Sequence, residues 1–172
     1  QAPAGNMTVT YPSPYSKLTN ACNLLSADDF GRLFGKPSDA LVNETLYLTE
    51  SEPKTALRQC QRIEVERLKE GEISSVTMGL SESRTEQQTK DRLSAIKTDK
   101  DKNEVKKLDK LGDEAYVVST GILDKDHHKI LIRSGKVILS IESNGEKKDT
   151  SVDAWVSRNL PIAQKILANY KK

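Results

Sequence analysis

Two adjacent histidines, His127 and His128, are the residues of this chain best suited by type to catalysis or metal binding. Asp124 and Asp126 lie just before them and could add carboxylate ligands in a loop. Neighbouring residues on a strand point to opposite faces of a sheet, so both imidazoles could bind one metal ion only in a turn. We interpret residues 124–128 as the exposed tip of a hairpin. A metal-dependent hydrolase is kept as an alternative that requires one histidine to converge with carboxylates.

A second pair of chemically capable residues is Asp113 and Glu114. Two carboxylates act as acid and base only when they converge and their environments separate their pKa values. Consecutive residues of a strand or turn rarely meet that requirement. We therefore expect Gly112 and Asp113 to form a turn, and Glu114 to be solvated or paired with a cation.

Recognisable catalytic motifs are absent from the sequence. It has no Gly-x-Ser-x-Gly elbow, no phosphate-binding loop, no His-Glu-x-x-His pair and no dinucleotide-binding glycine pattern. No sequence feature points to a serine–histidine nucleophile pair. We assign no catalytic, cofactor-binding or metal-binding residue, expect no cofactor, and predict a protein that is not an enzyme.

The chain has two cysteines, Cys22 and Cys60, and no histidine near either. Two cysteines alone make a poor metal site. A disulfide between them would close a loop of about forty residues and stabilise the fold by about 4 kcal/mol. That is a large share of a typical domain stability of about 5–15 kcal/mol. The alternatives are two buried free thiols or one reactive cysteine.

A short helix is predicted directly after the first cysteine. Ser26 is a suitable N-cap, Asp28 and Asp29 suit the positive end of the helix dipole, and Gly35 can end the helix. The helix has only about two turns, which is too short to be stable in isolation. It must be held by packing and by the preceding cysteine.

Composition limits the classes of partner. The 172 residues carry 27 basic and 25 acidic side chains, a net charge of +2, which argues against binding of nucleic acid or an anionic membrane surface. No apolar run approaches the roughly 20 residues of a membrane span. We divide the chain into an extended arm, residues 1–19, and a single domain, residues 20–172.

Hydrophobic alternation predicts an antiparallel meander after the first helix. Its strands are residues 40–48, 57–67 and 73–80. A bulge near Cys60 would let Cys60, Ile63 and Val65 face the same side. The capping-box pattern from Ser83 to Glu86 then predicts a surface helix over residues 84–98.

The second half of the chain holds the clearest hairpin. A strand over 115–119 is followed by two apolar runs, 130–133 and 137–141, joined by a turn at 134–136. Because both runs are almost continuously apolar, we expect both faces of this hairpin to be covered, one of them by a helix. The charged stretch 97–110 interleaves acids with lysines, and we interpret it as a solvated loop and strand edge.

The final segment has the strongest amphipathic pattern in the chain, with apolar residues at helical spacing between Val152 and Tyr170. Pro161 interrupts it, so we expect a kink, or two helices with a break at Asn159-Leu160. Trp155 is predicted to lie where this helix packs on the sheet. The fold class is therefore α+β: an antiparallel sheet of six to seven strands packed against a C-terminal helix and two shorter helices.

The order of these features resembles a known group of proteins. The matching blocks are Cys22-Asn23-Leu24-Leu25-Ser26, Leu33-Phe34-Gly35, a second cysteine on a strand, and Gly112-Asp113-Glu114-Ala115-Tyr116. The chain resembles bacterial lipoproteins and secreted proteins, common in actinobacteria, that have no established activity. The resemblance implies an α+β sandwich similar to the PsbP-like fold, with the two cysteines bridged, and it implies no chemistry.

These observations lead to an expected function. One disulfide and the start Gln1-Ala2-Pro3-Ala4 favour a periplasmic or extracellular protein, with a lipid anchor on a residue preceding Gln1 as one variant. We expect a non-enzymatic binding domain whose partner is another envelope or secreted protein. The first alternative is a carrier or sensor of a small apolar ligand held between the C-terminal helix and the sheet, which needs a cavity of several hundred Å³. The metal-dependent hydrolase is the second.

Overall fold

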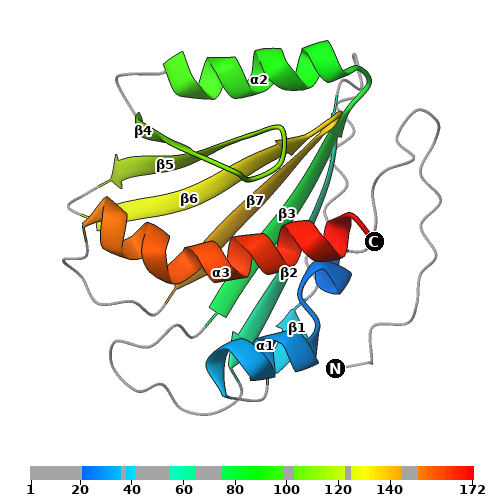
Figure 1. Ribbon diagram of the computed structural model, residues 1–172, viewed down its shortest axis with the longest axis vertical. Coiled ribbons are helices and arrows are strands. Elements are labelled where there is room, and N and C mark those ends of the chain that lie inside the picture. The colour runs from blue at the N-terminus through cyan, green and yellow to red at the C-terminus, as the bar shows by residue number, and fades with distance from the viewer. Residues whose placement is uncertain are drawn as a thin grey trace.

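An antiparallel sheet forms the centre of the computed structural model (Figure 1). The structure describes residues 21–35, 38–41, 55–64, 75–98, 103–122, 125–144 and 151–172. Within them the sheet has seven strands in the order β1-β2-β3-β7-β6-β5-β4. The strands are β1 (Ser38–Leu41), β2 (Thr55–Glu64), β3 (Ser75–Ser83), β4 (Asn103–Leu108), β5 (Glu114–Ile122), β6 (Lys125–Ser134) and β7 (Val137–Asn144).

Four helical segments accompany the sheet in the described residues. They are the 3₁₀ helix η1 (Ala21–Leu24) and the α-helices α1 (Ala27–Phe34), α2 (Glu86–Thr98) and α3 (Val152–Tyr170). The predicted α+β class is confirmed, with a C-terminal helix and two shorter α-helices around an antiparallel sheet. The predicted arm, residues 1–19, and most of the predicted strand 40–48 lie outside the described residues.

Helix α3 covers one face of the sheet and crosses in front of it in Figure 1. Strand alternation sends Ile130 and Ile132 to this face, and Trp155, Ile162 and Ile166 of α3 pack against them. The layer also includes Val76, Met78, Leu80, Ala115, Val117, Val137, Leu139 and Ile141 of the sheet, and Leu24, Leu25 and Phe30 from the N-terminal helices. This layer is the main core of the domain.

Helix α2 covers part of the opposite face. Leu93 packs there with Val118, Leu131 and Ile138, which occupy the alternate positions of β5, β6 and β7. Both faces of the β6–β7 hairpin are therefore covered, and each is covered by a helix. Gly135, with a φ of 58°, takes the left-handed backbone conformation at the two-residue turn between Ser134 and Val137.

Two sequence predictions about β2, β3 and α2 were wrong in detail. The register of β2 against β3 runs without a skip from Thr55↔Ser83 to Ile63↔Ser75, so the strand has no bulge at Cys60. Ser83 is the last residue of β3, and Thr85 caps α2 in its place. The Gln88 backbone N–H donates to Thr85 Oγ1 at 3.1 Å, and the Thr85 N–H donates to Gln88 Oε1 at 3.3 Å.

Helix α3 runs through Pro161 without the predicted break. Proline at this position deprives the carbonyl of Ser157, four residues earlier, of its usual donor. Both residues are exposed, so water can reach that carbonyl. The neighbouring Asn159 is buried and donates to the Trp155 carbonyl at 2.9 Å while accepting from Ser143 Oγ at 2.6 Å. The bond from Ser143 fastens the middle of α3 to β7.

Candidate functional site

The Gly112–Tyr116 block is the base of the candidate site. Gly112 has a φ of 59°, and a Cβ there would lie 2.5 Å from the Arg133 carbonyl oxygen, so only glycine fits. This close approach lets the Asp113 N–H donate to the same carbonyl at 2.9 Å. Asp113 Oδ2 accepts from the Gly135 N–H at 2.7 Å, so the predicted turn is tied to the β6–β7 turn.

Arg133 lies at the centre of a charged cluster that joins three segments. Its Nε donates to Glu114 Oε1 at 2.8 Å, and its Nη1 donates to Glu86 Oε1 at 3.0 Å and to Asp113 Oδ2 at 3.2 Å. The Arg133 side chain is only 9% exposed. We call Arg133, Glu86, Asp113 and Glu114 the Arg133 cluster. It shows that Glu114 is ion-paired, one of the two states expected for it.

The electrostatics of the cluster stabilise both of its central charges. Burial by itself opposes the charge on Arg133, but the hydrogen bond with Glu114 and the attraction of Asp113 outweigh it and raise the pKa of Arg133. Burial also raises the pKa of Glu114, but hydrogen bonds from Arg133 and Tyr116 outweigh burial and leave that pKa below its ordinary value. The charged forms of Arg133 and Glu114 are therefore both favoured at neutral pH.

Tyr116 extends the cluster to the far end of α2. Its hydroxyl donates to Glu114 Oε2 at 3.0 Å and accepts from Lys97 Nζ at 2.9 Å. The Lys97 ammonium also lies 4.4 Å from the centre of the Tyr116 ring, within range of a cation–π attraction. The charged groups form a line along α2, with Lys97 at one end and Glu86, in the first turn of the helix, at the other.

An open groove of about 540 Å³ lies beside these side chains, between α2 and the sheet, and we call it the α2 groove. The α2 side contributes residues at helical spacing, β4 contributes one lysine, and the Arg133 cluster contributes three residues of the lining. The lining residues are Gln87, Lys90, Asp91, Ser94, Lys97, Lys107, Asp113, Glu114 and Arg133. The groove therefore presents positive and negative side chains, and hydrogen bonds hold Asp113, Glu114 and Arg133 in place at its base.

The histidine prediction needs correction. His128 lies within β6 and not at an exposed hairpin tip; it is half-buried and its ring centre is 5.3 Å from that of Trp155. Its Nδ1 is 2.7 Å from Ser119 Oγ, directly across the β5–β6 pair. Asp124 and the side chains of Asp126 and His127 lie outside the part of the chain that the structure describes. Within the described residues, no cluster of three metal-ligating side chains occurs.

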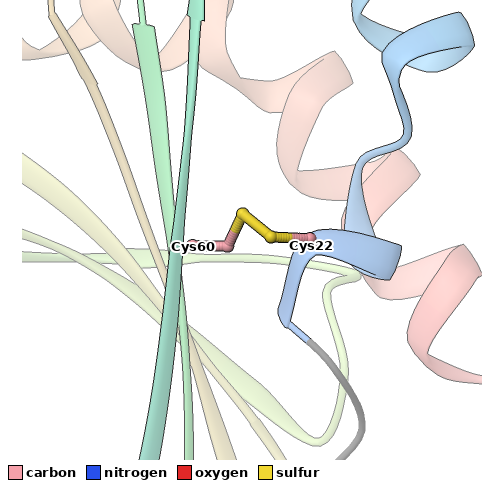
Figure 2. The surroundings of a disulfide bond; sticks show 2 residues. All are labelled: Cys22 and Cys60. Carbon is pink, nitrogen blue, oxygen red and sulfur yellow. A yellow bond between two sulfur atoms is a disulfide. The ribbon is translucent and has the colours of Figure 1, made fainter. Parts of the chain in front are cut away.

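The cysteines lie on the opposite side of the domain from the α2 groove. Cys22 of η1 and Cys60 of β2 are joined by a disulfide with an S–S distance of 2.08 Å and a Cα–Cα distance of 5.2 Å (Figure 2). The two sulfur atoms are bonded to each other, so neither the free-thiol nor the reactive-cysteine alternative describes this structure. The bond attaches η1 to the sheet directly before α1.

No protein family model, curated protein sequence or solved structure shows a match to this chain. Among the described residues, no helix combines the length and apolar character needed to cross a membrane.

Sequence reasoning found only part of the site. It named Asp113 and Glu114 and anticipated their turn and ion pair, but it did not find Arg133, which lies about 20 residues away. The available signal was an arginine directly after the apolar run Ile130-Leu131-Ile132, because a buried arginine must be paired. Ser119 was missed too, since nothing near it in the sequence distinguishes it from an ordinary strand serine.

Proposed function

We propose that this chain is an extracytoplasmic binding domain, and that a partner protein binds it in the α2 groove. The observation that carries the proposal is the Arg133 cluster, which holds the guanidinium and the carboxylates of Asp113 and Glu114 in fixed positions along the base of an open groove. A pre-ordered polar surface loses little conformational freedom when a partner binds, so more of the contact energy appears as affinity.

The charges around the groove favour a polar protein surface as the occupant. Lys90 and Asp91 are exposed on α2, and Lys107 is exposed on the edge strand β4. The rim carries both cations and an anion, which suits a partner segment that has both signs of charge and sets its orientation by charge complementarity. The extended shape along α2 fits a polypeptide segment.

The main core gives less support to the apolar-carrier alternative. The space between α3 and the sheet is filled by large side chains that are almost fully buried, including Ile132, Leu139, Ile162 and Ile166. A carrier needs a cavity of several hundred Å³ there. The native mass of the unreduced protein, purified from its own cell envelope, distinguishes the two functions: an added small-molecule mass would support a carrier, and a bare chain would favour protein binding.

The location rests on the disulfide. A Cys22–Cys60 disulfide is compatible with an extracellular or periplasmic setting, because disulfides persist in oxidising compartments. Secretion, the lipid anchor on a residue preceding Gln1, and membership of the lipoprotein family that the sequence resembles are part of the proposal. The Gly112–Tyr116 block, which contributes to that resemblance, forms the base of the α2 groove.

Site-specific photo-crosslinking in the native envelope tests the groove. A photoreactive residue is placed at Ser94, which lines the groove, or at Ala168, an exposed position on α3 that serves as the matched control. We expect one discrete adduct at Ser94 and none at Ala168. Lys107→Glu should weaken the Ser94 adduct, whereas Lys171→Glu, the same charge change at an exposed position in the C-terminal segment, should not.

Two results would contradict this proposal. One is equal crosslinking from Ser94 and Ala168, which would indicate random encounter. The other is the absence of any protein adduct from Ser94 under conditions in which the crosslinker reacts with a control protein.

A further inference from the structure

A second chemically capable site lies on the α3 face of the sheet, away from the α2 groove. Ser119 of β5 and His128 of β6 are a directly opposed cross-strand pair, and Ser119 Oγ lies 2.7 Å from His128 Nδ1. That distance is within the range at which a histidine can take a proton from a nucleophilic hydroxyl. The two residues are nine positions apart in the chain, and only the strand pairing brings them together.

Ser119 also lines a small cavity of about 200 Å³. The walls come from β4 and β5 on one side and from the start of α3 on the other. The lining residues are Lys106, Val117, Ser119, Ser151, Val152 and Asp153. The serine is only 8% exposed and forms part of the cavity wall, so a small molecule that fills the cavity contacts it.

Packing holds the base in place. The His128 ring lies against Trp155, which is 3% exposed and is anchored in the main core. With the ring proton on Nε2, the Nδ1 atom faces the Ser119 hydroxyl as an acceptor. A fixed imidazole beside a serine is the minimal arrangement for nucleophilic catalysis.

We propose that Ser119 and His128 form a catalytic pair that hydrolyses small acyl esters in this cavity. Ser119 Oγ attacks the ester carbonyl carbon while its proton passes to His128 Nδ1. The C–O bond to the alcohol breaks, and the alcohol leaves with that proton. Water then attacks the acyl-serine with His128 as base, which releases the carboxylic acid and restores the serine.

The start of α3 supplies groups that suit the negative charge formed on the carbonyl oxygen. Ser151 caps the helix by accepting from the Ala154 N–H at 3.2 Å. The N–H groups of Val152 and Asp153 precede the first intrahelical bond, so the helix itself gives them no acceptor. Lys106 lies at the same cavity and pairs with Asp153. The volume restricts the acyl group to a short chain.

This inference departs from the expectation of a chain without catalytic residues, and it does not rest on the groove function. The two sites lie on opposite faces of the sheet, so either can fail alone. It also needs no metal ion, unlike the hydrolase weighed from the sequence.

The test uses the intact protein with p-nitrophenyl acetate as substrate and diisopropyl fluorophosphate as a covalent probe. We expect one phosphoryl adduct, mapped to Ser119 by peptide mass. Ser119→Ala and His128→Gln should each lower the hydrolysis rate by at least about tenfold. Ser134→Ala, which removes a half-buried serine of β6 that lines neither the cavity nor the α2 groove, should leave the rate unchanged.

The wild-type adduct does not depend on whether any variant folds, and circular dichroism confirms the fold of each variant. The proposal is overturned if Ser119 takes no adduct, or if folded Ser119→Ala hydrolyses the ester at the wild-type rate. An adduct that forms as quickly in His128→Gln as in the wild type overturns the role of the histidine.

Discussion

The two faces of the sheet are held by different physical means. On the α3 face, Ile132, Leu139 and Ile166 are fully buried in one large apolar layer. On the α2 face, a small apolar cluster around Leu93 is accompanied by the Arg133 cluster, whose outer carboxylates are about half exposed. Burial of apolar area is strong and undirected, whereas ion pairs are weaker but fix side chains in defined positions. The α3 face therefore provides stability, and the α2 face provides an ordered surface.

The largest effect is expected at the disulfide, which fastens η1 to the α3-side core. The double variant Cys22→Ser with Cys60→Ser should lose about 4 kcal/mol of unfolding free energy, because the unfolded chain regains the freedom of a long loop. Urea denaturation measures this. A loss below about 1 kcal/mol would show that packing alone holds η1, since removal of a native disulfide typically costs about 2–5 kcal/mol.

Truncating one buried residue on each face compares the two layers directly. Ile166→Ala in the main core should cost about 3–4 kcal/mol, within the range for buried aliphatic side chains. Leu93→Ala in the small cluster should cost about 2–3 kcal/mol, since its half-buried neighbours can move into the space. Chemical denaturation of both variants gives the difference. Equal losses of unfolding free energy would contradict the conclusion that the α3 face contributes more to stability than the α2 face.

The Arg133 cluster should show the next largest effect. Arg133→Met leaves three carboxylates near each other without their cation, and we expect a loss of about 1–3 kcal/mol. Arg133→Lys should recover part of it, because an ammonium keeps the charge but cannot reproduce the forked contacts. Replacing a buried ion network by apolar groups sometimes stabilises a protein. If Arg133→Met is as stable as the wild type, the cluster is a network of this kind and does not contribute to the stability of the fold.

Acidification should weaken the α2 face in a definable pH range. The pKa of Glu114 is lower in the folded protein than its ordinary value of 4.5, because hydrogen bonds from Arg133 and Tyr116 outweigh the opposing effect of burial. The stabilisation is fully present above about pH 4.5 and is lost as the pH falls through the lower folded pKa. The fall in Tm between about pH 6 and about pH 3 should be smaller in Glu114→Gln. An unchanged fall in this variant would contradict the assignment.

The smallest effect is expected at the exposed pair that Glu86 of the cluster forms with Lys90. Lys90 and Glu86 approach to 3.5 Å on α2, with side chains 46% and 52% exposed. Lys90→Ala should change the unfolding free energy by only about 0.3–0.5 kcal/mol, as is usual for such helix pairs. Thermal denaturation at low and high salt checks this. A loss above about 1 kcal/mol would show that exposed charges also help hold α2.

Local chemistry in the sequence was sufficient for several elements. Ser26 caps α1 as predicted, with the Asp29 N–H donating to its hydroxyl at 3.0 Å, because the cap and its donor lie within one turn. The β6–β7 hairpin was predicted from its apolar runs and Gly135. The amphipathic pattern of α3 likewise predicted its buried face. The break predicted at Pro161 does not occur, because water can reach the Ser157 carbonyl that the proline leaves without a donor.

Other features depended on pairings between distant residues. Arg133 meets Asp113 across 20 positions and Glu86 across 47. Ser119 meets His128 only because β5 and β6 pair in one register. The N-cap of α2 is Thr85 and not the predicted Ser83, because Ser83 belongs to β3 and pairs with Thr55. The sequence by itself determined the elements whose signals lie within a few residues of one another. Only the tertiary structure decided which charges meet, since strand register and helix placement set distances that no local pattern records.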